Sequence, residues 1–575
     1  MQHQNFPVSC ASFGELLRQR AQQQPDERLY SFLRDDGGED TISYAQLFAR
    51  AQNIASHLLA TNSSANSNLN SPTNARVLLL LPPGLDIIAG FFGCLLAGLV
   101  AVPLPSPHPA RLQIQKERLL SVAHDAQPSI VLCDAATQIA LQPIREEIDI
   151  AADSKLPWIC CDELSANEFE WRAPEISGQM TAFLQYTSGS TARPKGVLVS
   201  HQNLLHNCAL IYRAFEHNAE SRGVIWLPPY HDMGLIGGVL QPLYGGFPVS
   251  LFSPTSFLMK PLRWLQTISN TRATTSGAPN FAYELCAHKI TDAQKQTLDL
   301  SSWQVAFVGA EPVREETLNR FARAFDSCGF RREAFLPCYG LAESTLLVSG
   351  EKKNPVPQIA IKNNRRFVSC GLAATELDVR IVDAERSTPF RDGEMVADGE
   401  IGEIFVAGKS VAKGYWNRDA ETSQTFGARL PGKDTINFLR TGDLGFFQGG
   451  ELFICGREKD LILIAGRNHF PEDIEATLAA ADSLVRAGVA FGVDIQNEEN
   501  LLEEKLVAAV EIDRLSFLDE AQKATLMARL KSEIASRHDL RAHQVLLYRV
   551  GALPRTTSGK IQRARCRAEY SATRN

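Results

Sequence analysis

Segments with the apolar patterns of strands and helices alternate along most of this 575-residue chain, and this alternation restricts the fold more than any other feature. One clear passage predicts a buried strand at 77–81, a helix at 85–97 and a second strand at 99–102. Such alternation is typical of α/β layers. Because one hydrophobic core stops growing at roughly 250–300 residues, the sequence predicts an α/β protein with more than one domain.

Charge and hydropathy exclude several broad classes of protein. Lysine and arginine number 58 against 65 aspartate and glutamate residues, so there is no basic surplus for binding the phosphates of nucleic acid. The longest apolar run, 87–102, is interrupted by three glycines and is shorter than the ~20 residues that span a bilayer. No signal peptide precedes it, so we expect a cytoplasmic protein without a transmembrane segment.

Three further patterns concern the cysteines, a polar tract and the domain organisation. The twelve cysteines form no C-x-x-C pair, which favours buried free thiols. The polar tract 60–74 predicts a mobile surface loop. Charged residues gather at 456–460, and a compact series of strands and helices follows them, so we expect domains at 1–458 and 459–575. The series comprises helices at 471–481 and 518–537 and strands at 461–464, 487–491, 506–512 and 544–549.

The segment 184–196 is the most informative for chemistry. Four hydroxyl groups, two glycines and one lysine fall within 187–196, between two predicted strands. Such a donor-rich loop suits phosphate oxygens. The order Lys195-Gly196 and the strand that follows differ from the Walker A loop, which opens a helix. A solvated turn rich in serine and threonine is the alternative interpretation of this segment alone.

Further motifs follow in one order along nearly the whole chain. Together with that loop they resemble the acyl-adenylate-forming (AMP-binding) superfamily, which includes acyl-CoA synthetases, luciferases and adenylation domains of peptide synthetases. The motifs are TSGSTARPKG (187–196), WLPPYHDMG (226–234), VGAEP (308–312), YGLAES (339–344), YW (415–416), RTGD (440–443), GREKD (456–460) and LPRTTSGK (553–560).

The resemblance implies a fold, a requirement for ATP and a metal ion, and a set of site residues. The expected fold is α/β, with a large N-terminal domain of two packed sheets plus a small β-barrel-like part, and a small mobile α+β C-terminal domain. ATP and Mg²⁺ are required. Lys560 and His231 are the expected catalytic residues, Glu343 and Thr187 the metal ligands, and Asp460 the hinge. The expected ATP- and AMP-binding residues are Thr187, Ser188, Gly189, Ser190, Thr191, Lys195, Gly309, Ala310, Glu311, Tyr339, Gly340, Leu341, Ala342, Asp443 and Arg457.

These residue types also fit the chemistry by themselves. A carboxylate that attacks the α-phosphate of ATP builds negative charge on phosphorus, so catalysis needs positioning and neutralisation of charge. Lys560 supplies a point charge, Glu343 offers the hard oxygen that Mg²⁺ prefers, and Tyr339 offers a flat face to adenine. Asp443 suits ribose hydroxyls. Taken alone, Lys560 would be a surface lysine, His231 a structural histidine and Asp443 part of a turn.

Several details resemble one branch of the superfamily, the long-chain fatty acyl-AMP ligases. They are HDMG (231–234), YGLAE (339–343), VSCG (368–371), GRNHFPEDIE (466–475) and an insertion at 351–367. This implies activation of a fatty acid as acyl-AMP and its transfer to the phosphopantetheine of an acyl carrier protein. Small and apolar residues at 233–239 favour a long apolar tunnel. Two alternatives stay open: an acyl-CoA synthetase that uses free coenzyme A, and an acyl- or nucleotide-binding module without catalysis.

The segment 351–367 has its own predicted role. Pro355 and Pro357 would stiffen it, and Ile359 and Ile361 alternate as in a strand that packs an apolar face. A packed segment there could hinder the rotation that admits coenzyme A, whereas a mobile surface loop would not. Ala192 stands where the superfamily usually has glycine, so the geometry of the phosphate loop is expected to differ.

Overall fold

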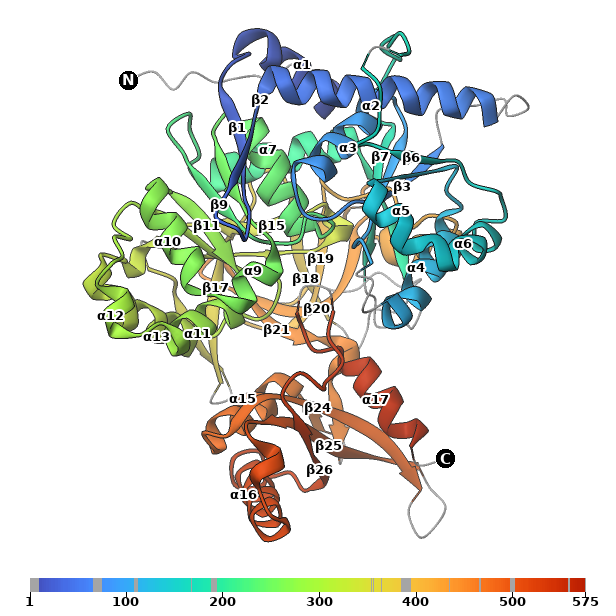
Figure 1. The fold of residues 1–575 in the computed structure, drawn as a ribbon. Helices are drawn as coiled ribbons and strands as arrows, with labels where there is room; N and C mark the ends of the chain where they lie inside the picture. Colours follow the sequence, from blue (N-terminus) through green and yellow to red (C-terminus); the bar gives the residue numbers. More distant parts are fainter. Residues whose placement is uncertain are drawn as a thin grey trace. The chain divides into compact units, whose positions relative to one another are not determined.

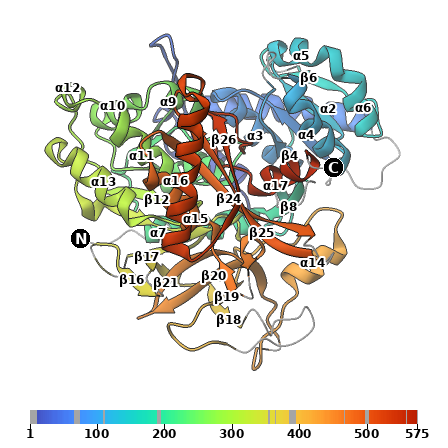
Figure 2. The same cartoon turned by 90° about the horizontal axis from the view of Figure 1, so that it is seen from below.

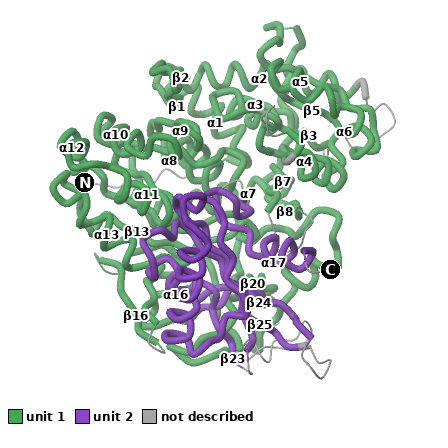
Figure 3. Tube along the Cα trace, turned by 60° about the horizontal axis from the view of Figure 1, so that its bottom comes forward, with its two compact units in different colours: residues 1–189, 193–441, 446–454 green, residues 190–192, 442–445, 455–575 purple. Residues whose placement is uncertain are grey.

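A computed structural model describes most of the chain (Figure 1). Its residues form two compact units (Figure 3). Unit 1 comprises 1–189, 193–441 and 446–454, and unit 2 comprises 190–192, 442–445 and 455–575. The described residues are 10–65, 75–107, 112–166, 168–187, 194–352, 354, 356–362, 365–383, 395–433, 435–464, 467–496, 502–556 and 559–573.

The first sheet of unit 1 has six strands in the order β6-β5-β3-β4-β7-β8. All neighbouring pairs are parallel except β7 and β8, which form an antiparallel hairpin. The predicted passage of strand, helix and strand is confirmed as β3, α3 (Leu85–Leu96) and β4. The strands are β3 (Arg76–Leu80), β4 (Val100–Pro103), β5 (Ile130–Cys133), β6 (Trp158–Cys160), β7 (Thr181–Thr187) and β8 (Lys195–Ser200).

The second sheet has seven strands in the order β13-β12-β11-β9-β10-β1-β2. It is parallel except at its edge, where β2 runs antiparallel to β1. The strands are β1 (Arg28–Leu33), β2 (Glu39–Ser43), β9 (Gly223–Ile225), β10 (Val249–Leu251), β11 (Thr275–Ala278), β12 (Val305–Val308) and β13 (Phe335–Pro337).

Helices cover both sheets (Figure 1). One face of the six-stranded sheet packs an apolar cluster against α4, α5 and α6, and the larger core of unit 1 joins its other face to the seven-stranded sheet. The helices are α1 (Phe13–Gln23), α2 (Tyr44–Ala65), α4 (Leu112–Ala126), α5 (Ala135–Leu141), α6 (Arg145–Ala151), α7 (His201–Ala214), α8 (Gln241–Gly245), α9 (Pro254–Met259), α10 (Leu262–Thr271), α11 (Asn280–Lys289), α12 (Asp292–Lys295), α13 (Glu315–Phe325) and α14 (Asp419–Phe426).

The third sheet corresponds to the expected β-barrel-like part. Its order is β14-β15-β17-β21-β20-β19-β18, and β16 pairs only with β17 at its side. The pairs β14–β15, β15–β17, β17–β21 and β18–β19 are antiparallel. The strands are β14 (Tyr339–Gly340), β15 (Leu347–Glu351), β16 (Ile359–Lys362), β17 (Arg365–Ala373), β18 (Asp378–Val382), β19 (Gly402–Ala407), β20 (Leu439–Gln448) and β21 (Glu451–Arg457).

Unit 2 is built on a three-stranded sheet, β24-β25-β26 (Figure 2), and also contains a small hairpin of β22 and β23. Alternate residues of β24 face opposite ways: Ala490 joins the cluster with α15 and α16, whereas Phe491 joins the cluster with α17. The elements are β22 (Ile462–Ile464), β23 (Arg467–His469), α15 (Pro471–Ala481), β24 (Val485–Gln496), β25 (Leu502–Ile512), α16 (Glu520–His538), β26 (Ala542–Arg549) and α17 (Arg563–Ala572).

The predicted mobile loop at 60–74 is wrong over its first part. Helix α2 continues to Ala65, because Asn62 is buried and the Ser63 hydroxyl donates to the carbonyl of Leu59 at 2.9 Å. Residues 66–74 lie outside the described residues. The predicted free thiols are confirmed, since all twelve cysteines are unpaired and most are buried. Within the described ranges, no helix combines the length and apolar character that crossing a bilayer requires.

Candidate active site

The β7–β8 hairpin places two of the expected phosphate-binding residues opposite each other. Thr187 ends β7 and Lys195 begins β8, and they are partners in the antiparallel register. The Lys195 ammonium forms an ion pair with Glu421 of α14, and this hydrogen bond lowers the pKa of the Glu421 carboxyl. The predicted loop between two strands is therefore confirmed. The expected residues Ser188, Gly189, Ser190 and Thr191, together with Ala192, lie outside the described residues.

Two other expected loops meet at one edge of the seven-stranded sheet. The parallel strands β12 and β13 are neighbours, and residues 309–311 and 339–342 follow their carboxyl ends. Ligands in α/β sheets bind at such edges. The Cys338 amide donates to Val308 at 2.8 Å, and a Cβ atom on Gly309 would lie only 2.9 Å from the Cys338 carbonyl oxygen. Glycine at 309 therefore allows the loops to approach closely.

Backbone strain marks both of these loops, which the sequence did not predict. Ala310 has φ of 68° and Thr345 has φ of 67°, in the region that non-glycine residues avoid. Each such residue costs of order 1–3 kcal/mol, and such strain clusters at functional sites. Thr345 is held by its hydroxyl, which donates to the carbonyl of Ser410 at 2.6 Å. The turn that carries Glu343 is thus fixed by its surroundings.

Glu311 carries an unsatisfied acceptor in the first of these loops. Its Oε1 atom is buried and accepts no hydrogen bond from the part of the chain that the structure describes. A buried acceptor without a donor costs about 1–3 kcal/mol. An amino or hydroxyl group of a nucleotide would supply the donor, so this residue fits the expected binding of ATP. Tyr339, in the neighbouring loop, is buried and 8% exposed.

Glu343 is held by one side chain. The Tyr415 hydroxyl donates to its Oε1 at 2.9 Å, and the Ala412 amide donates to its backbone carbonyl at 2.8 Å. Across the described ranges, no three histidine, cysteine or carboxylate side chains gather as a metal site. A magnesium ion at Glu343 would therefore take most of its ligands from phosphate groups and water, as is usual for this ion.

His231 lies in a short loop tied to the same hairpin. Its Nδ1 is 2.6 Å from Asp232 Oδ1, and the side chain of Gln185 in β7 donates to the Tyr230 carbonyl at 3.1 Å. A π-helical segment, Met233–Leu240, follows and is almost entirely buried. Segments of this kind occur often at functional sites. The structure thus brings His231 close to the β7–β8 hairpin within unit 1.

The described part of unit 2 contains four other expected residues. Arg457 Nε donates to Asp443 Oδ1 at 2.9 Å, and the side chain of Asp443 is only 7% exposed. Lys560 closes a turn, since the Thr556 amide donates to its carbonyl at 2.7 Å and its own amide donates to the Thr556 hydroxyl at 3.1 Å. The fourth, Asp460, is 2.6 Å from the guanidinium of Arg563.

Three residues with clear roles in this geometry were not among the expected site residues: Tyr415, Glu421 and Arg563. Tyr415 lies in the YW motif, but nothing in the sequence indicates that its hydroxyl contacts a glutamate 72 positions away. Glu421 and Arg563 carry ordinary charges. Their ion pairs with Lys195 and Asp460 join residues that lie far apart in the sequence.

The segment 351–367 forms a hairpin of β16 and β17 in its described part. The predicted strand is confirmed, but its predicted apolar face is only partly correct: Ile359 packs against the core of unit 1, whereas Ile361 is 63% exposed and Ala360 is buried. The register pairs Ala360 with the buried Phe367, so that side faces the core. Pro355 lies outside the described residues.

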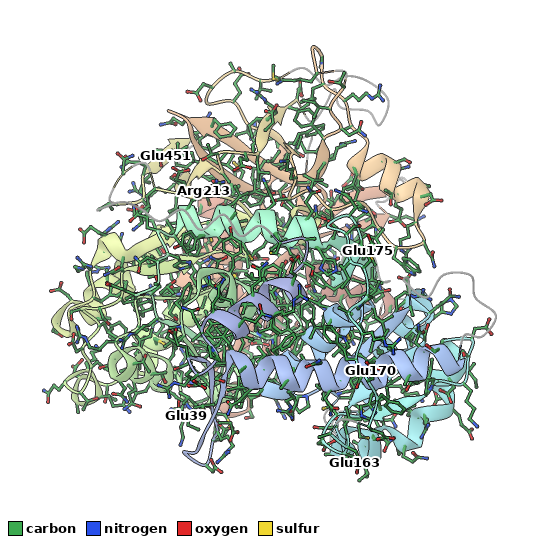
Figure 4. The ribbon with its side chains drawn as sticks, turned by 90° about the horizontal axis from the view of Figure 1, so that it is seen from above. Glu39, Glu163, Glu170, Glu175, Arg213 and Glu451 are labelled. Carbon is green, nitrogen blue, oxygen red and sulfur yellow. The ribbon has the colours of Figure 1, made fainter. Side chains whose placement is uncertain are left out.

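Polar contacts anchor this hairpin to unit 1. Arg366 Nη2 donates to Glu315 Oε1 at 3.0 Å, and Asn354 Nδ2 donates to Glu451 Oε1 at 2.7 Å (Glu451 is labelled in Figure 4). Glu451 also accepts from the Ser369 hydroxyl. These contacts fix the described ends of the segment to α13 and β21.

Comparison with known proteins gives consistent matches over the whole chain. The family model for AMP-binding enzymes matches residues 17–416, and the model for the C-terminal domain of AMP-binding enzymes matches 458–573. JamA of Moorena producens, a medium-chain-fatty-acid–[acyl-carrier-protein] ligase, is 41% identical over 97% of this chain and 94% of its own length. FadD21 of Mycobacterium tuberculosis, whose name proposes a fatty-acid–CoA ligase, is 35% identical over 98% of both chains.

A solved structure shows the same similarity. The fatty acyl-adenylate ligase of Legionella pneumophila, in complex with acyl adenylate and pyrophosphate, has a TM-score of 0.72 and 38% identity. The match covers 98% of this chain and 97% of that one.

Proposed function

Because the chain belongs to the family of AMP-binding enzymes, we propose that it activates a medium- or long-chain fatty acid with ATP and transfers it to an acyl carrier protein. The observation that carries this proposal is the similarity to JamA over nearly the full length of both proteins. The first step yields acyl-AMP and pyrophosphate. The second step yields an acyl thioester on the phosphopantetheine of the carrier protein and releases AMP.

In the first step, a carboxylate oxygen of the fatty acid attacks the α-phosphorus of ATP. The bond from that phosphorus to the bridging oxygen breaks, and pyrophosphate leaves with its electrons. Lys195 neutralises charge on the β- and γ-phosphates, and Lys560 neutralises charge at the α-phosphate and the attacking carboxylate. Such charge neutralisation is the main way in which proteins accelerate phosphoryl transfer.

The remaining site residues bind and orient the substrates. The loops at 309–311 and 339–342 hold adenine between the sheet edge and Tyr339, and Asp443 with Arg457 holds the ribose. His231 orients the carboxylate of the fatty acid, and the buried segment Met233–Leu240 contributes to the apolar tunnel. Glu343 and Thr187 hold Mg²⁺, which, when bound, neutralises phosphate charge as a Lewis acid.

Domain movement separates the two steps in this proposal. We place the boundary at residues 458/459 and the hinge at Asp460. A swing of the C-terminal domain would withdraw Lys560 after the first step. A cytoplasmic location completes the proposal.

The proposal is tested by measuring pyrophosphate release with fatty acids of increasing chain length. Each reaction is run alone, with coenzyme A, and with a carrier protein that bears phosphopantetheine. We expect pyrophosphate release that depends on fatty acid, and acyl transfer to the carrier protein with little acyl-CoA. Efficient formation of acyl-CoA would favour the acyl-CoA synthetase. Binding of ATP or fatty acid without pyrophosphate release would favour a binding module.

A variant of the 351–367 segment tests why coenzyme A is disfavoured. Residues 353–364 would be replaced by a flexible Gly-Ser linker, which removes β16 and the hydrogen bond from Asn354 to Glu451. The residues that pair β17 with β15 and β21 are kept. If the segment hinders access of coenzyme A, the ratio of acyl-CoA to acyl-AMP rises while adenylate formation stays the same. Ile361→Ser is the matched control, because it changes only an exposed residue of β16. An unchanged ratio in the shortened variant would contradict the gating role.

A further inference from the structure

The segment 412–416 connects two separate parts of the candidate site. The Ala412 amide donates to the Glu343 carbonyl at 2.8 Å. Two residues on, the Gly414 carbonyl accepts from Leu198 at 2.9 Å and the Trp416 amide donates to Gly196 at 2.8 Å, so the chain runs along β8. The backbone of this segment is therefore fixed beside both the turn that carries Glu343 and the β7–β8 hairpin.

The side chain of Tyr415 points to the functional groups of both parts. Its hydroxyl donates to Glu343 Oε1 at 2.9 Å, and the Lys195 ammonium lies 5.2 Å from the centre of its ring. The ring packs edge-on against Phe426 at 5.2 Å, so its orientation is set by the core.

A chain of ion pairs also holds Lys195. Glu421, which pairs with Lys195, also accepts from Arg418 at 3.2 Å. Arg418 in turn pairs with Asp125 at 2.7 Å, and Asp125 accepts from the Tyr186 hydroxyl at 2.7 Å. The ammonium thus contacts both a fixed carboxylate and the Tyr415 ring.

We propose that Tyr415 is a positioning residue of the magnesium–triphosphate site, which orients Glu343 through its hydroxyl and supports Lys195 through its ring. The inference rests on the proposed function, since it takes Glu343 as the protein's metal ligand and Lys195 as a phosphate ligand. Across the described ranges, Tyr415 alone hydrogen-bonds to the Glu343 carboxylate. Without that bond, the carboxylate would sample several rotamers and meet the metal in only some of them.

The expected effect follows from the behaviour of residues that orient metal ligands. Loss of such a partner typically costs about 10–100-fold in metal affinity. Tyr415→Phe removes only the hydroxyl and keeps the ring, its contact with Phe426 and its position beneath Lys195. We therefore expect Tyr415→Phe to weaken Mg²⁺ binding about tenfold and to leave metal-free binding of the nucleotide unchanged.

The primary measurement is binding, not turnover. A non-hydrolysable ATP analogue is titrated into the full-length protein by calorimetry at a series of Mg²⁺ concentrations, and the Mg²⁺ midpoint is compared between variants. In steady-state assays, saturating Mg²⁺ should restore the kcat of Tyr415→Phe. Tyr570→Phe is the matched control, because its hydroxyl donates to Gln544 at 2.7 Å in unit 2.

A double-mutant cycle separates positioning from a merely structural role. If Tyr415 acts through Glu343, adding Tyr415→Phe to Glu343→Gln should leave the Mg²⁺ midpoint where Glu343→Gln alone puts it. An additive shift, or a wild-type midpoint in Tyr415→Phe, overturns the inference. If Tyr415→Phe does not fold, Glu343→Gln with a wild-type midpoint overturns it equally. The proposed function fails separately, by absence of fatty-acid-dependent pyrophosphate release in the wild type.

Discussion

Lys560→Ala is expected to lower the rate of acyl-AMP formation by about 10²–10³-fold, or roughly 3–4 kcal/mol, while binding of the fatty acid survives. The substitution leaves the local backbone intact, because the turn is closed by main-chain bonds and by the hydroxyl of Thr556. What is lost is one positive charge at the phosphorus where negative charge develops. The measurement is fatty-acid-dependent pyrophosphate release under saturating substrates.

Lys531→Ala is the matched control for this prediction. Lys531 is an exposed lysine of α16 in the same unit, and its loss should leave the rate unchanged. Binding of a fluorescent fatty acid to the Lys560→Ala variant checks that the acyl site is intact. Wild-type pyrophosphate release by that variant would show that Lys560 is not the catalytic lysine.

Local patterns in the sequence predict those elements whose ends carry their own signals. The helix at 471–481 agrees with α15 at both ends, because Pro471 suits the first turn of a helix and acidic residues follow it there. The passage from β3 to β4 was predicted within one residue for the same reason, since apolar runs bounded by glycine and proline are local.

Local sequence patterns give a wrong prediction where a contact with a distant part of the chain determines the structure. Helix α2 continues through a tract of polar residues because the body of unit 1 buries Asn62. In β16 the side chains alternate as expected, but the register with β17 turns Ala360 inward and leaves Ile361 exposed. A period of two fixes alternation but not which face is buried.

The candidate site shows the same difference between residues that local motifs identify and residues that only the folded structure brings together. Thr187, Lys195, Glu343 and Asp443 could be named from motifs because each chemistry needs that residue type in a recognisable context. The partners that orient them could not be named. Arg563, for example, lies 103 residues from Asp460, and no local spacing reports a contact formed by folding.

Arg563→Met is expected to destabilise unit 2 by up to about 3–5 kcal/mol, because it leaves three largely buried carboxylates without a counter-charge. The guanidinium, 17% exposed, lies 2.6 Å from Asp460, 3.2 Å from Glu472 and 2.9 Å from Glu475. Methionine keeps much of the volume and none of the charge. Unfolding of the full chain in urea, followed by circular dichroism, measures the loss.

The pH dependence of this loss gives a second, independent check. Burial raises the pKa of Glu472 above its ordinary value although the charge of Arg563 opposes this, so removal of the guanidinium should raise the pKa of Glu472 further in the folded state. Folded groups with raised carboxyl pKa values bind protons more tightly than the unfolded chain does. The deficit of Arg563→Met should therefore be largest near neutral pH and shrink as the pH falls to about 5.

Arg565→Met is the matched control, two residues along the same helix. Arg565 is 58% exposed and pairs with Glu569 one turn away, and such surface pairs contribute about 0–1 kcal/mol. Equal urea midpoints for the two variants would contradict the role of the carboxylate cluster around Arg563.

Asp460 is both a member of this cluster and the proposed hinge. Asp460→Asn should lower the free energy of unfolding less than Arg563→Met does. It removes one negative charge from the cluster and leaves Arg563 paired with Glu472 and Glu475.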